Sequence, residues 1–253
     1  MGVSPADVVA ARAVLTVCAH PDDESFGLGA LVTAFADAGM SVSGISFTHG
    51  EASTLSGSRS GLETVRMAEL AAAARALRMT DVELLHYPDG RLIEVPVEDL
   101  ATIVVRRAQK TQSDALLVFD DGGVTGHPDH QQATDAALRA AEILDLPVLA
   151  WAIPEWIAAT LNSDFGTGFV GRTRPELDAA FEVSRDRQLL AIGCHVSQST
   201  ANPVLWRRLE LLGDIEVVRW LRHAGDHATQ TGATVAAGLG PAKDDEPSST
   251  ADR

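Results

Sequence analysis

Continuous hydrophobic segments rich in β-branched residues alternate along the first part of the chain with segments whose apolar residues recur at helical spacing. The continuous segments predict buried strands, because strands covered on both faces of a parallel sheet lack a polar face. These predicted strands are residues 13–19, 41–48, 82–87, 115–120 and 147–153. The segments with helical spacing predict helices near residues 26–38, 62–77, 97–110 and 129–144.

The alternation of strands and helices predicts an α/β fold: a Rossmann-like, mostly parallel sheet with helices on both faces, in a single domain. After residue 153 the pattern is less regular. Residues 177–184 predict a further strand and residues 186–195 a short helix. Residues 203–224 have the pattern of a helix pair or a broken helix.

The composition changes towards the end of the sequence. Residues 224–253 are rich in Ala, Gly, Thr, Asp and Ser and contain almost no large apolar side chains. Such a segment cannot bury enough apolar surface to offset the entropy of ordering it. We therefore expect the folded domain to span residues 1–223 and residues 224–253 to form a disordered acidic tail.

Charge and cysteine content limit the classes of partner. The formal net charge of −15 disfavours nucleic acid and anionic membrane surfaces, and leaves a neutral or cationic small substrate open. No apolar segment approaches the roughly 18 residues of a membrane span, and the first residues lack the pattern of a secretory signal. The two cysteines, Cys18 and Cys194, exclude a disulfide framework, so we expect a cytoplasmic protein.

A charged turn follows the first predicted strand. Pro21 has no N–H group and a fixed φ, so it ends the strand and stiffens the turn that holds His20, Asp22 and Asp23. Within a tight turn, His20 and Asp23 can face one centre while Asp22 lies beside it. The alternative is structural: Asp22 or Asp23 caps the following helix, and His20 is a polar core residue.

A second His-Pro-Asp turn lies at the fourth junction of a strand with a helix. His127 and His130 are three residues apart, which places them on one face of the first helical turn. Imidazole and carboxylate groups suit zinc and similar divalent metals. The alternative is a glycine-rich loop with solvated histidines.

Polar residues follow each of the first four predicted strands, at residues 20–23, 48–51, 89–90 and 120–130. The carboxyl ends of parallel strands meet at one edge of a sheet, where ligands bind. We therefore expect all four polar clusters to converge there.

The paired turns resemble the motifs of the PIG-L/LmbE-like zinc-dependent N-deacetylases. This family includes N-acetylglucosaminyl-phosphatidylinositol deacetylase and the bacterial deacetylases of mycothiol and bacillithiol synthesis. Its first motif looks like A-H-P-D-D-E, matched by residues 19–24, and its second like H-P-D-H, matched by residues 127–130. Weaker matches are FTHGE, TVRMAEL and IGCHVSQ, so the resemblance extends over about residues 14–198.

The resemblance implies a metal-dependent hydrolase that removes an acetyl group from an N-acetylated amino sugar or sugar conjugate. The metal ligands would be His20, Asp23 and His130, which leave a position open for water, as catalytic zinc requires. The ion would be zinc, with Fe²⁺ or another divalent metal as alternatives. Asp22 would be the general base that accepts a proton from the attacking water.

The resemblance also implies a group that stabilises the oxyanion. This group would be a protonated His127, held in its tautomer by Asp129. Mycothiol-type members carry a Tyr two residues before the first His of the second motif, where this chain has Thr125. Many relatives carry Arg in the T-x-G-E turn, where this chain has His49.

Further candidates for substrate binding are Arg66, Asp89, His195 and Gln198. Each also has a structural interpretation. Arg66 and Glu69 are spaced for an ordinary ion pair on one helix. Asp89 lies in a Pro-Asp-Gly turn, and His195 and Gln198 lie in a segment typical of a structural turn.

Three alternative functions remain at this stage. The chain could be an amidase of a thiol-sugar conjugate within the same family, or a non-catalytic metal- or sugar-binding module on the same fold. A nucleotide-binding Rossmann protein is disfavoured, because "FGLGALV" contains only part of the G-x-G-x-x-G fingerprint. The expected partner is a small N-acetylated sugar, with no nucleic acid and no membrane. The oligomeric state and the substrate's aglycone are left open.

Overall fold

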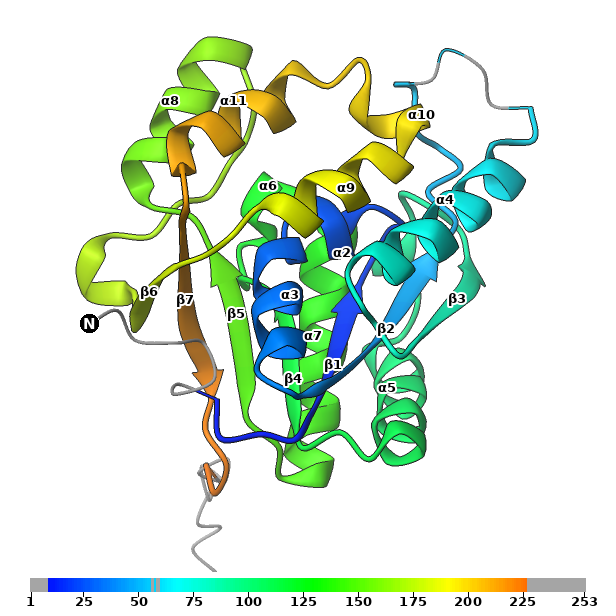
Figure 1. Ribbon diagram of the computed structural model, residues 1–253. Helices are drawn as coiled ribbons and strands as arrows, with labels where there is room; N and C mark the ends of the chain where they lie inside the picture. The colour runs from blue at the N-terminus through cyan, green and yellow to red at the C-terminus, as the bar shows by residue number, and fades with distance from the viewer. Residues whose placement is uncertain (1–8, 56, 58–59, 227–253) are drawn as a thin grey trace, which may run out of the picture.

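Within residues 9–55, 57 and 60–226, which the computed structural model describes, one seven-stranded sheet organises the chain (Figure 1). From edge to edge the strands follow the order β3-β2-β1-β4-β5-β7-β6. Their bounds are β1 Ala13–Cys18, β2 Ser41–Thr48, β3 Asp81–Tyr87, β4 Ala115–Phe119, β5 Val148–Ala152, β6 Ala179–Glu182 and β7 Ile215–Arg222. The strands from β3 through β5 run parallel, whereas β7 is antiparallel to both β5 and β6. The predicted mostly parallel sheet is therefore confirmed.

Helices cover both faces of the sheet (Figure 1). They are α2 Asp23–Phe26, α3 Gly29–Asp37, α4 Leu62–Ala76, α5 Val97–Thr111, α6 Gly123–Gly126, α7 Pro128–Leu144, α8 Glu155–Phe165, α9 Asp186–Cys194, α10 Val196–Ser199 and α11 Pro203–Leu212, with short 3₁₀ turns at Leu92–Glu94 and Arg174–Glu176. Helices α3, α4 and α9 pack on one face, and α5 and α7 on the other (Figure 1).

Two hydrophobic cores result, because successive strand residues point to opposite faces. In β1, Val14 packs in one core with Phe35 of α3. Its neighbour Leu15 packs in the other core with Leu100 of α5 and Ala137 of α7. This two-sided burial is the physical reason that the strands read as continuous apolar segments.

The structure corrects the prediction for residues 203–224. The first half is helix α11, but the second half is strand β7 rather than a second helix. Gly213 ends α11 with a φ of 56°, and the segment IEVVRWLR then pairs with β5 and β6. Its β-branched and aromatic residues favour a strand. The hydrogen bonds that residues 215–222 form with β5 and β6 therefore decide the structure of this part, although the apolar residues of segment 203–224 have helical spacing.

The structure differs from the predicted elements in two smaller ways. The predicted helix at residues 26–38 is divided into α2 and α3, and helix α8 was not predicted. The expected disordered tail lies outside the described residues from position 227 onwards. Among the helices that the structure describes, none combines the length and apolar character needed to cross a membrane.

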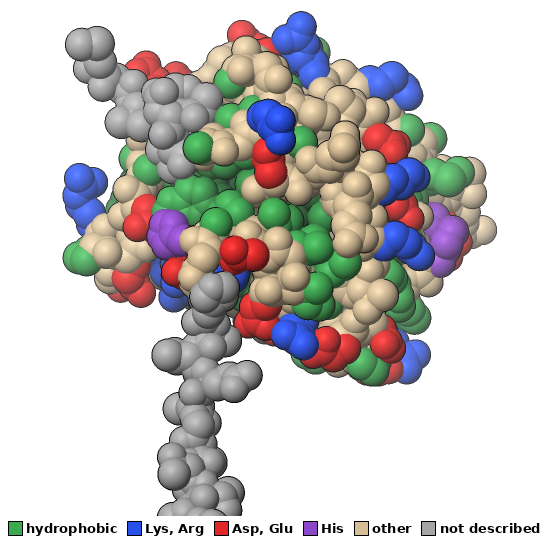
Figure 2. Space-filling view, turned by 90° about the horizontal axis from the view of Figure 1, so that it is seen from below, with side chains coloured by type: hydrophobic (Ala, Val, Ile, Leu, Met, Phe, Trp, Pro, Cys, Tyr) green, Lys and Arg blue, Asp and Glu red, His purple; other side chains and the backbone are tan. Residues whose placement is uncertain are grey.

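The amino-terminal edge of the parallel strands lies opposite the polar turns. Seen from this side, acidic and basic side chains are interspersed with apolar ones over the described part of the face (Figure 2). The clusters of histidine and aspartate that the motifs predict lie at the opposite, carboxyl edge.

Two glycines let the turn after β1 pack closely against its neighbours. A Cβ atom on Gly27 would lie 2.6 Å from Phe119 and 2.9 Å from Trp151. A Cβ atom on Gly29 would lie 2.9 Å from the side chain of Gln188 in α9. At both positions only glycine leaves room for these close contacts.

Gly27→Ala is expected to lower the free energy of unfolding by about 1–3 kcal/mol, because the added methyl overpacks against aromatic rings. Gly193→Ala in α9 is the matched control, since nothing lies within 4 Å of its Cβ position. It is expected to raise the free energy of unfolding by about 0.5–1 kcal/mol. Urea denaturation measures both. Equal stability of Gly27→Ala and the wild type would contradict the packing argument.

Candidate active site

The candidate site lies at the carboxyl edge of the parallel strands, where three turns meet. The turn after β1 contributes His20 and Asp23, and the start of α7 contributes His127 at its N-cap and His130 in its first turn. The turn after β3 contributes Asp89, whose Oδ1 lies 3.0 Å from Nε2 of His20. The predicted convergence of these turns is therefore confirmed.

Three side chains direct ligand-type atoms at one point. Nδ1 of His20 lies 3.1 Å from Nε2 of His130, which in turn lies 3.1 Å from Oδ1 of Asp23. Nδ1 of His20 lies 3.7 Å from Oδ2 of Asp23. Ligand atoms around a tetrahedral zinc ion with bonds of about 2.0–2.1 Å lie about 3.3 Å apart. The spacing of the three side chains fits such an ion.

The outer nitrogen of His130 is held by the loop that precedes α7. Its Nδ1 lies 3.1 Å from the carbonyl oxygen of Gly123 and 3.0 Å from Oγ1 of Thr125. The carbonyl can only accept, so it favours a proton on Nδ1 and leaves the lone pair of Nε2 facing the common point. Thr125 thus contacts a histidine of the donor set at the position where related enzymes were expected to carry Tyr.

The outer nitrogen of His20 faces two carboxylates. Its Nε2 lies 3.0 Å from Asp89 and 3.4 Å from Asp129, off the axis of a linear hydrogen bond. These carboxylates favour a proton on Nε2, so Nδ1 presents its lone pair to His130 and Asp23. Two lone pairs and a carboxylate repel one another unless a cation lies between them. The donor set therefore fits a divalent metal ion.

The carboxylates around the site favour positive charge on or beside His20. Burial alone would lower the pKa of His20, but Asp129 and Asp89 raise it to about 10. Burial would likewise raise the pKa of Asp23, yet His130 and His20 hold it below the usual range. The turns therefore concentrate negative charge around a point that requires positive charge.

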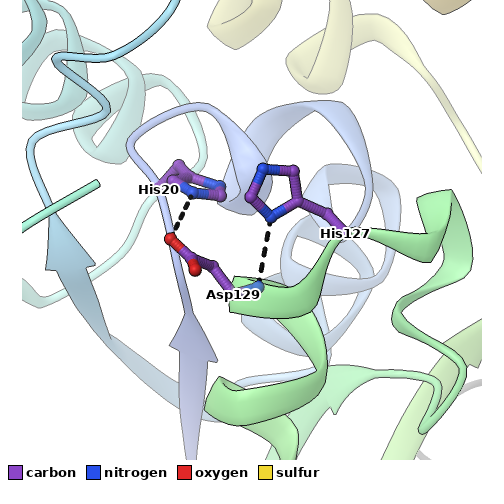
Figure 3. A group of neighbouring side chains, drawn as sticks. All are labelled: His20, His127 and Asp129. Atoms are coloured by element: carbon purple, nitrogen blue, oxygen red, sulfur yellow. Dashed lines mark hydrogen bonds and ion pairs between the residues drawn. The ribbon is translucent and has the colours of Figure 1, made fainter. Parts of the chain in front are cut away.

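A second group, His20, His127 and Asp129, also lies close enough to share an ion (Figure 3). The carboxylate of Asp129 is fully buried, and it accepts hydrogen bonds from the N–H groups of Gly90, at 2.8 Å, and Leu92, at 3.0 Å. Both oxygens of Asp129 are thus engaged by the main chain, whereas the main-chain bonds of Asp23 reach only its Oδ2 and leave Oδ1 facing His130. The group with Asp23 and His130 therefore fits an ion better.

Asp129 contacts His127 through its main chain. The carboxylate of Asp129 faces His20, whereas its main-chain N–H donates to Nδ1 of His127 at 3.2 Å (Figure 3). The proton of a neutral His127 is therefore on Nε2. Partial burial and the nearby His20 and His130 lower the pKa of His127. This shift favours the neutral imidazole, and the role of a protonated His127 stays a prediction.

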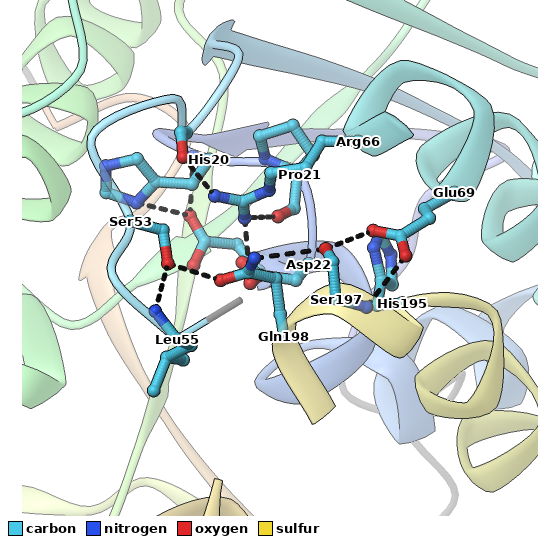
Figure 4. Close-up of polar contacts among 12 residues, drawn as sticks. His20, Pro21, Asp22, Ser53, Leu55, Arg66, Glu69, His195, Ser197 and Gln198 are labelled. Atoms are coloured by element: carbon cyan, nitrogen blue, oxygen red, sulfur yellow. Dashed lines mark hydrogen bonds and ion pairs between the residues drawn. The ribbon is translucent and has the colours of Figure 1, made fainter. Parts of the chain in front are cut away.

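Asp22 lies beside the donor set and is held by Arg66 of α4 (Figure 4). Its carboxylate lies 2.8 Å from Nη2 of Arg66. Its φ of 112° is in the left-handed region that non-glycine residues rarely adopt, and such strain is typical of functional sites. Burial raises the pKa of Asp22 to about 6, although the charge of Arg66 opposes this effect.

The guanidinium of Arg66 is committed to the turns around it. Besides Asp22, it donates to the carbonyl oxygens of Gly50, at 2.6 Å, and of Pro21. A Cβ atom on Gly50 would lie 1.8 Å from Nη1 of Arg66, so only glycine leaves room for this contact. The alternative ion pair of Arg66 with Glu69 does not form. Arg66 instead positions Asp22, and its contact with substrate stays a prediction.

Glu69 joins α4 to α10 on the other side of the site (Figure 4). It accepts hydrogen bonds from the N–H of Ser197 at 2.8 Å and from its Oγ at 2.6 Å. The neighbouring Gln198 accepts a hydrogen bond from Oγ of Ser53 at 2.6 Å. Gln198 lines the cavity described below, and its contact with substrate stays a prediction.

The structure does not support substrate contact by His195. This side chain is fully buried, and its Nε2 lies 2.7 Å from Oε1 of Glu24. The other carboxylate oxygen of Glu24 accepts from the main-chain N–H of Asp22 at 2.9 Å. His195 and Glu24 therefore lie behind the turn and hold the strained backbone of Asp22. No role for Glu24 was predicted, although it belongs to the first motif.

A cavity of about 410 Å³ lies over the donor set. On one side its wall is polar, with Ser53, Asp89 and Gln198 from the turns after β2 and β3 and from α10. On the side of α2, β4 and α11 the wall is largely apolar. The apolar lining consists of Phe26, Phe119, Val204 and Leu205 on these elements and of Phe169 after α8, and Asn202 and Arg208 add polar groups. The motifs did not point to Arg208.

His49 and His86 form a stacked pair near this edge. Their ring centroids are 4.6 Å apart, and Nε2 of His49 lies 2.9 Å from Nδ1 of His86. Neither residue lines the cavity. The exchange of Arg for His at position 49 is therefore accommodated by a local partner on β3.

The chain belongs to the PIG-L family, described as GlcNAc-PI de-N-acetylase, whose model matches residues 15–141. This match contains the donor set, Asp22, Arg66 and the turn after β3. The resemblance inferred from the two motifs is confirmed at the level of the family.

The particular relatives are deacetylases of amino sugars. The chain is 33% identical over 173 residues to 1D-myo-inositol 2-acetamido-2-deoxy-alpha-D-glucopyranoside deacetylase 1 of Catenulispora acidiphila. That match covers 58% of this chain and 54% of the relative. The chain therefore spans about half the length of the curated relatives it matches.

Solved structures share the fold at low identity. N,N'-diacetylchitobiose deacetylase from Pyrococcus horikoshii aligns with a TM-score of 0.60 and 22% identity, over 83% of this chain and 84% of that one. The 4-carboxy-2-hydroxymuconate hydratase from Pseudomonas putida aligns with a TM-score of 0.65 and 16% identity, over 83% and 96%. The two solved proteins are named for different reactions, so this likeness confirms the predicted α/β architecture and does not indicate the reaction.

His195→Gln is expected to lower the free energy of unfolding at pH 6 by about 1–3 kcal/mol, because a buried carboxylate loses a charged donor. Burial opposes protonation of His195, but Glu24 raises its pKa above the ordinary 6.5. The stabilisation is therefore fully present below pH 6.5 and is lost as the pH rises through the raised pKa.

The difference between wild type and His195→Gln should accordingly shrink as the pH rises from neutral to alkaline. Urea denaturation at a series of pH values measures it. His223→Gln, which changes an exposed histidine, serves as the control. A difference that stays constant with pH would show that the charge of His195 does not hold Glu24.

Proposed function

We propose that this chain is a metal-dependent hydrolase that removes the acetyl group from an N-acetylated amino sugar or sugar conjugate. The observation that carries the proposal is the convergence of His20, Asp23 and His130, with Asp22 beside them and outside the donor set. Membership of the PIG-L family supports it. A pure metal- or sugar-binding module would have no need for a strained carboxylate in this position.

The proposed donor set is His20, Asp23 and His130, and zinc is the proposed ion. When bound, the ion would supply Lewis-acid polarisation of the amide carbonyl and would lower the pKa of a water molecule. Three protein ligands are the number that catalytic zinc sites use. The buried acceptors behind both histidines keep their inner nitrogens directed at the ion.

Asp22 is the proposed general base. Arg66 and Glu24 hold its side chain and its main-chain N–H respectively, so the carboxylate has little freedom to turn away from the cavity. It would accept the proton of the attacking water and pass it to the leaving amine. A base works best when its pKa lies near the working pH, and burial moves Asp22 in that direction.

His127 is the proposed donor to the developing oxyanion. Its Nδ1 accepts from the N–H of Asp129, so its Nε2–H is free to donate. A fixed neutral donor stabilises negative charge in the transition state without reorganisation. Thr125 contacts His130 and has a short side chain, so His127 carries this role without a phenol from that position.

An N-acetylated sugar is the proposed substrate class. The side chains of Ser53, Asp89 and Gln198 offer hydrogen-bonding groups along one wall of the cavity. The relative from Catenulispora acidiphila is named as a deacetylase of such a sugar. The cytoplasmic location stays a prediction from cysteine usage.

His20→Ala and His130→Ala are each expected to lose bound metal, because two ligands cannot hold the ion tightly. Asp22→Asn is expected to keep the metal and to lose about 10²–10⁴-fold in turnover, since only the base is removed. Mass spectrometry of bound metal and an assay of acetate release measure the two effects. Full activity of Asp22→Asn would refute the base assignment.

The reaction itself is tested with the zinc-loaded protein and a panel of N-acetylglucosamine conjugates, beside a chelator-treated control. We expect acetate and a free amine in equal amounts, lost on chelation and restored by zinc. Release of a larger acid in place of acetate would indicate an amidase of another conjugate. Binding without any product would indicate a non-catalytic module.

A further inference from the structure

Arg208 brings an unusual charge to the wall of the cavity. It extends from α11 and is only 5% exposed, yet it lines the cavity over the donor set. One guanidinium nitrogen, Nη2, donates to the carbonyl oxygen of Phe26 at 2.5 Å. The guanidinium also lies over the ring of Trp151, with Cζ 5.0 Å from the ring centroid.

No carboxylate pairs with this guanidinium among the residues that the structure describes. The buried carboxylate of Glu216 is taken up by Arg185, at 2.6 Å, and by Nε1 of Trp151, at 2.6 Å. Nε of Arg208 is buried with no hydrogen-bond partner. Arg208 is therefore a buried cation that directly contacts only a carbonyl dipole and an aromatic face, while the charges of Glu216, Asp23 and Asp22 act on it from a greater distance.

The charge persists at neutral pH. Burial lowers the pKa of Arg208, but only to about 10. A buried cation is costly unless an anion compensates it, and most buried arginines have a carboxylate for that purpose. This one instead faces the space that a substrate would fill.

The surroundings of Arg208 would strengthen an ionic contact. The cavity wall near it is formed by apolar side chains of α2, β4 and α11, among them Phe26, Phe119 and Leu205. Such a wall excludes water and lowers the local dielectric, which increases the attraction between opposite charges. Of the guanidinium nitrogens, Nη1 has no partner within the described residues and is not sealed off as Nε is.

We infer that Arg208 forms an anion-binding subsite, in which Nη1 receives a carboxylate or phosphate group carried by the substrate. That the bound molecule is a substrate rests on the proposed deacetylation, whereas the anion-binding subsite itself is defined by the side chain of Arg208 and the cavity. It narrows the substrate class from N-acetylated sugars in general to those with an anionic substituent. The protein has a net charge of −15 and therefore repels anions over most of its surface, so Arg208 would attract a carboxylate or phosphate specifically to this cavity.

The test compares binding of three probes to the zinc-loaded full chain by calorimetry. The probes are N-acetylglucosamine, N-acetylglucosamine 6-phosphate and N-acetylmuramic acid, which differ in bearing no anion, a phosphate or a carboxylate. Every protein in the comparison carries Asp22→Asn, so that turnover does not disturb the measurement. We expect at least one anionic probe to bind tenfold or more tightly than the neutral one, and the better of the two identifies the group.

Substitutions then assign the preference to the side chain. Arg208→Gln is expected to reduce the preference for the anionic probe to less than threefold, and Arg208→Lys to keep part of it. Arg207→Gln is the matched control, because the neighbouring Arg207 is 36% exposed and pairs with Asp164 and Glu210 on the surface. It is expected to keep the full preference. Thermal unfolding confirms that each variant is folded.

Equal binding of all three probes to the protein with Arg208 intact would overturn the inference, whether or not Arg208→Gln folds. A preference that survives in Arg208→Gln would also overturn it, because the anion would then be bound elsewhere, for example at the zinc ion. Failure of the proposed function looks different. The wild-type protein would release no acetate, while the charge-dependent binding at Arg208 would remain.

Discussion

Charge compensation at the carboxyl edge of the sheet is the constraint on which the rest of this structure depends. Strand order brings the turns after β1, β3 and β4 together, and with them carboxylates and imidazoles that water would otherwise solvate. The two inner nitrogens of His20 and His130 face each other across the carboxylate of Asp23. Positive charge at the centre, from a bound ion or from a proton between the two imidazoles, relieves the repulsion among these groups. The position of the turns and the chemistry of the site therefore depend on the same electrostatic compensation.

Around this centre the protein uses buried hydrogen bonds to hold groups that would otherwise relax. Asp22 has a backbone conformation that is costly for a residue with a side chain, and Arg66, Glu24 and His195 keep it in place. The cost is distributed over helix α2, helix α4 and the junction of α9 with α10, which are far apart in sequence. A side chain with no access to the cavity, such as His195, can therefore matter to catalysis through the geometry of its neighbours.

Much of the architecture follows from local pattern, and some of it does not. The buried parallel strands could be predicted from the sequence because both of their faces are covered, which makes each strand a continuous apolar segment. Strand β7 was predicted wrongly because its place is decided by pairing with β5, a contact between distant parts of the chain that the spacing of apolar residues cannot reveal.

The donor set could be predicted from the sequence because its members lie in two compact motifs. The tautomer of His127 and the partners of Arg66 and His195 were not, because they depend on which groups the folded chain brings within hydrogen-bond distance. Arg208 illustrates the same limit, since an arginine in a helix has no mark in the sequence that distinguishes a buried one from its exposed neighbour.

The antiparallel direction of β7 has a practical consequence. The strand carries the chain from the end of α11, beside the cavity, down to the amino-terminal edge of the sheet (Figure 1). Residues 222–226 therefore leave the sheet on the side remote from the opening. An affinity label, a fluorophore or a surface linker attached beyond that point starts away from the cavity mouth, which makes this end the natural choice for immobilising the protein while its ligands are studied.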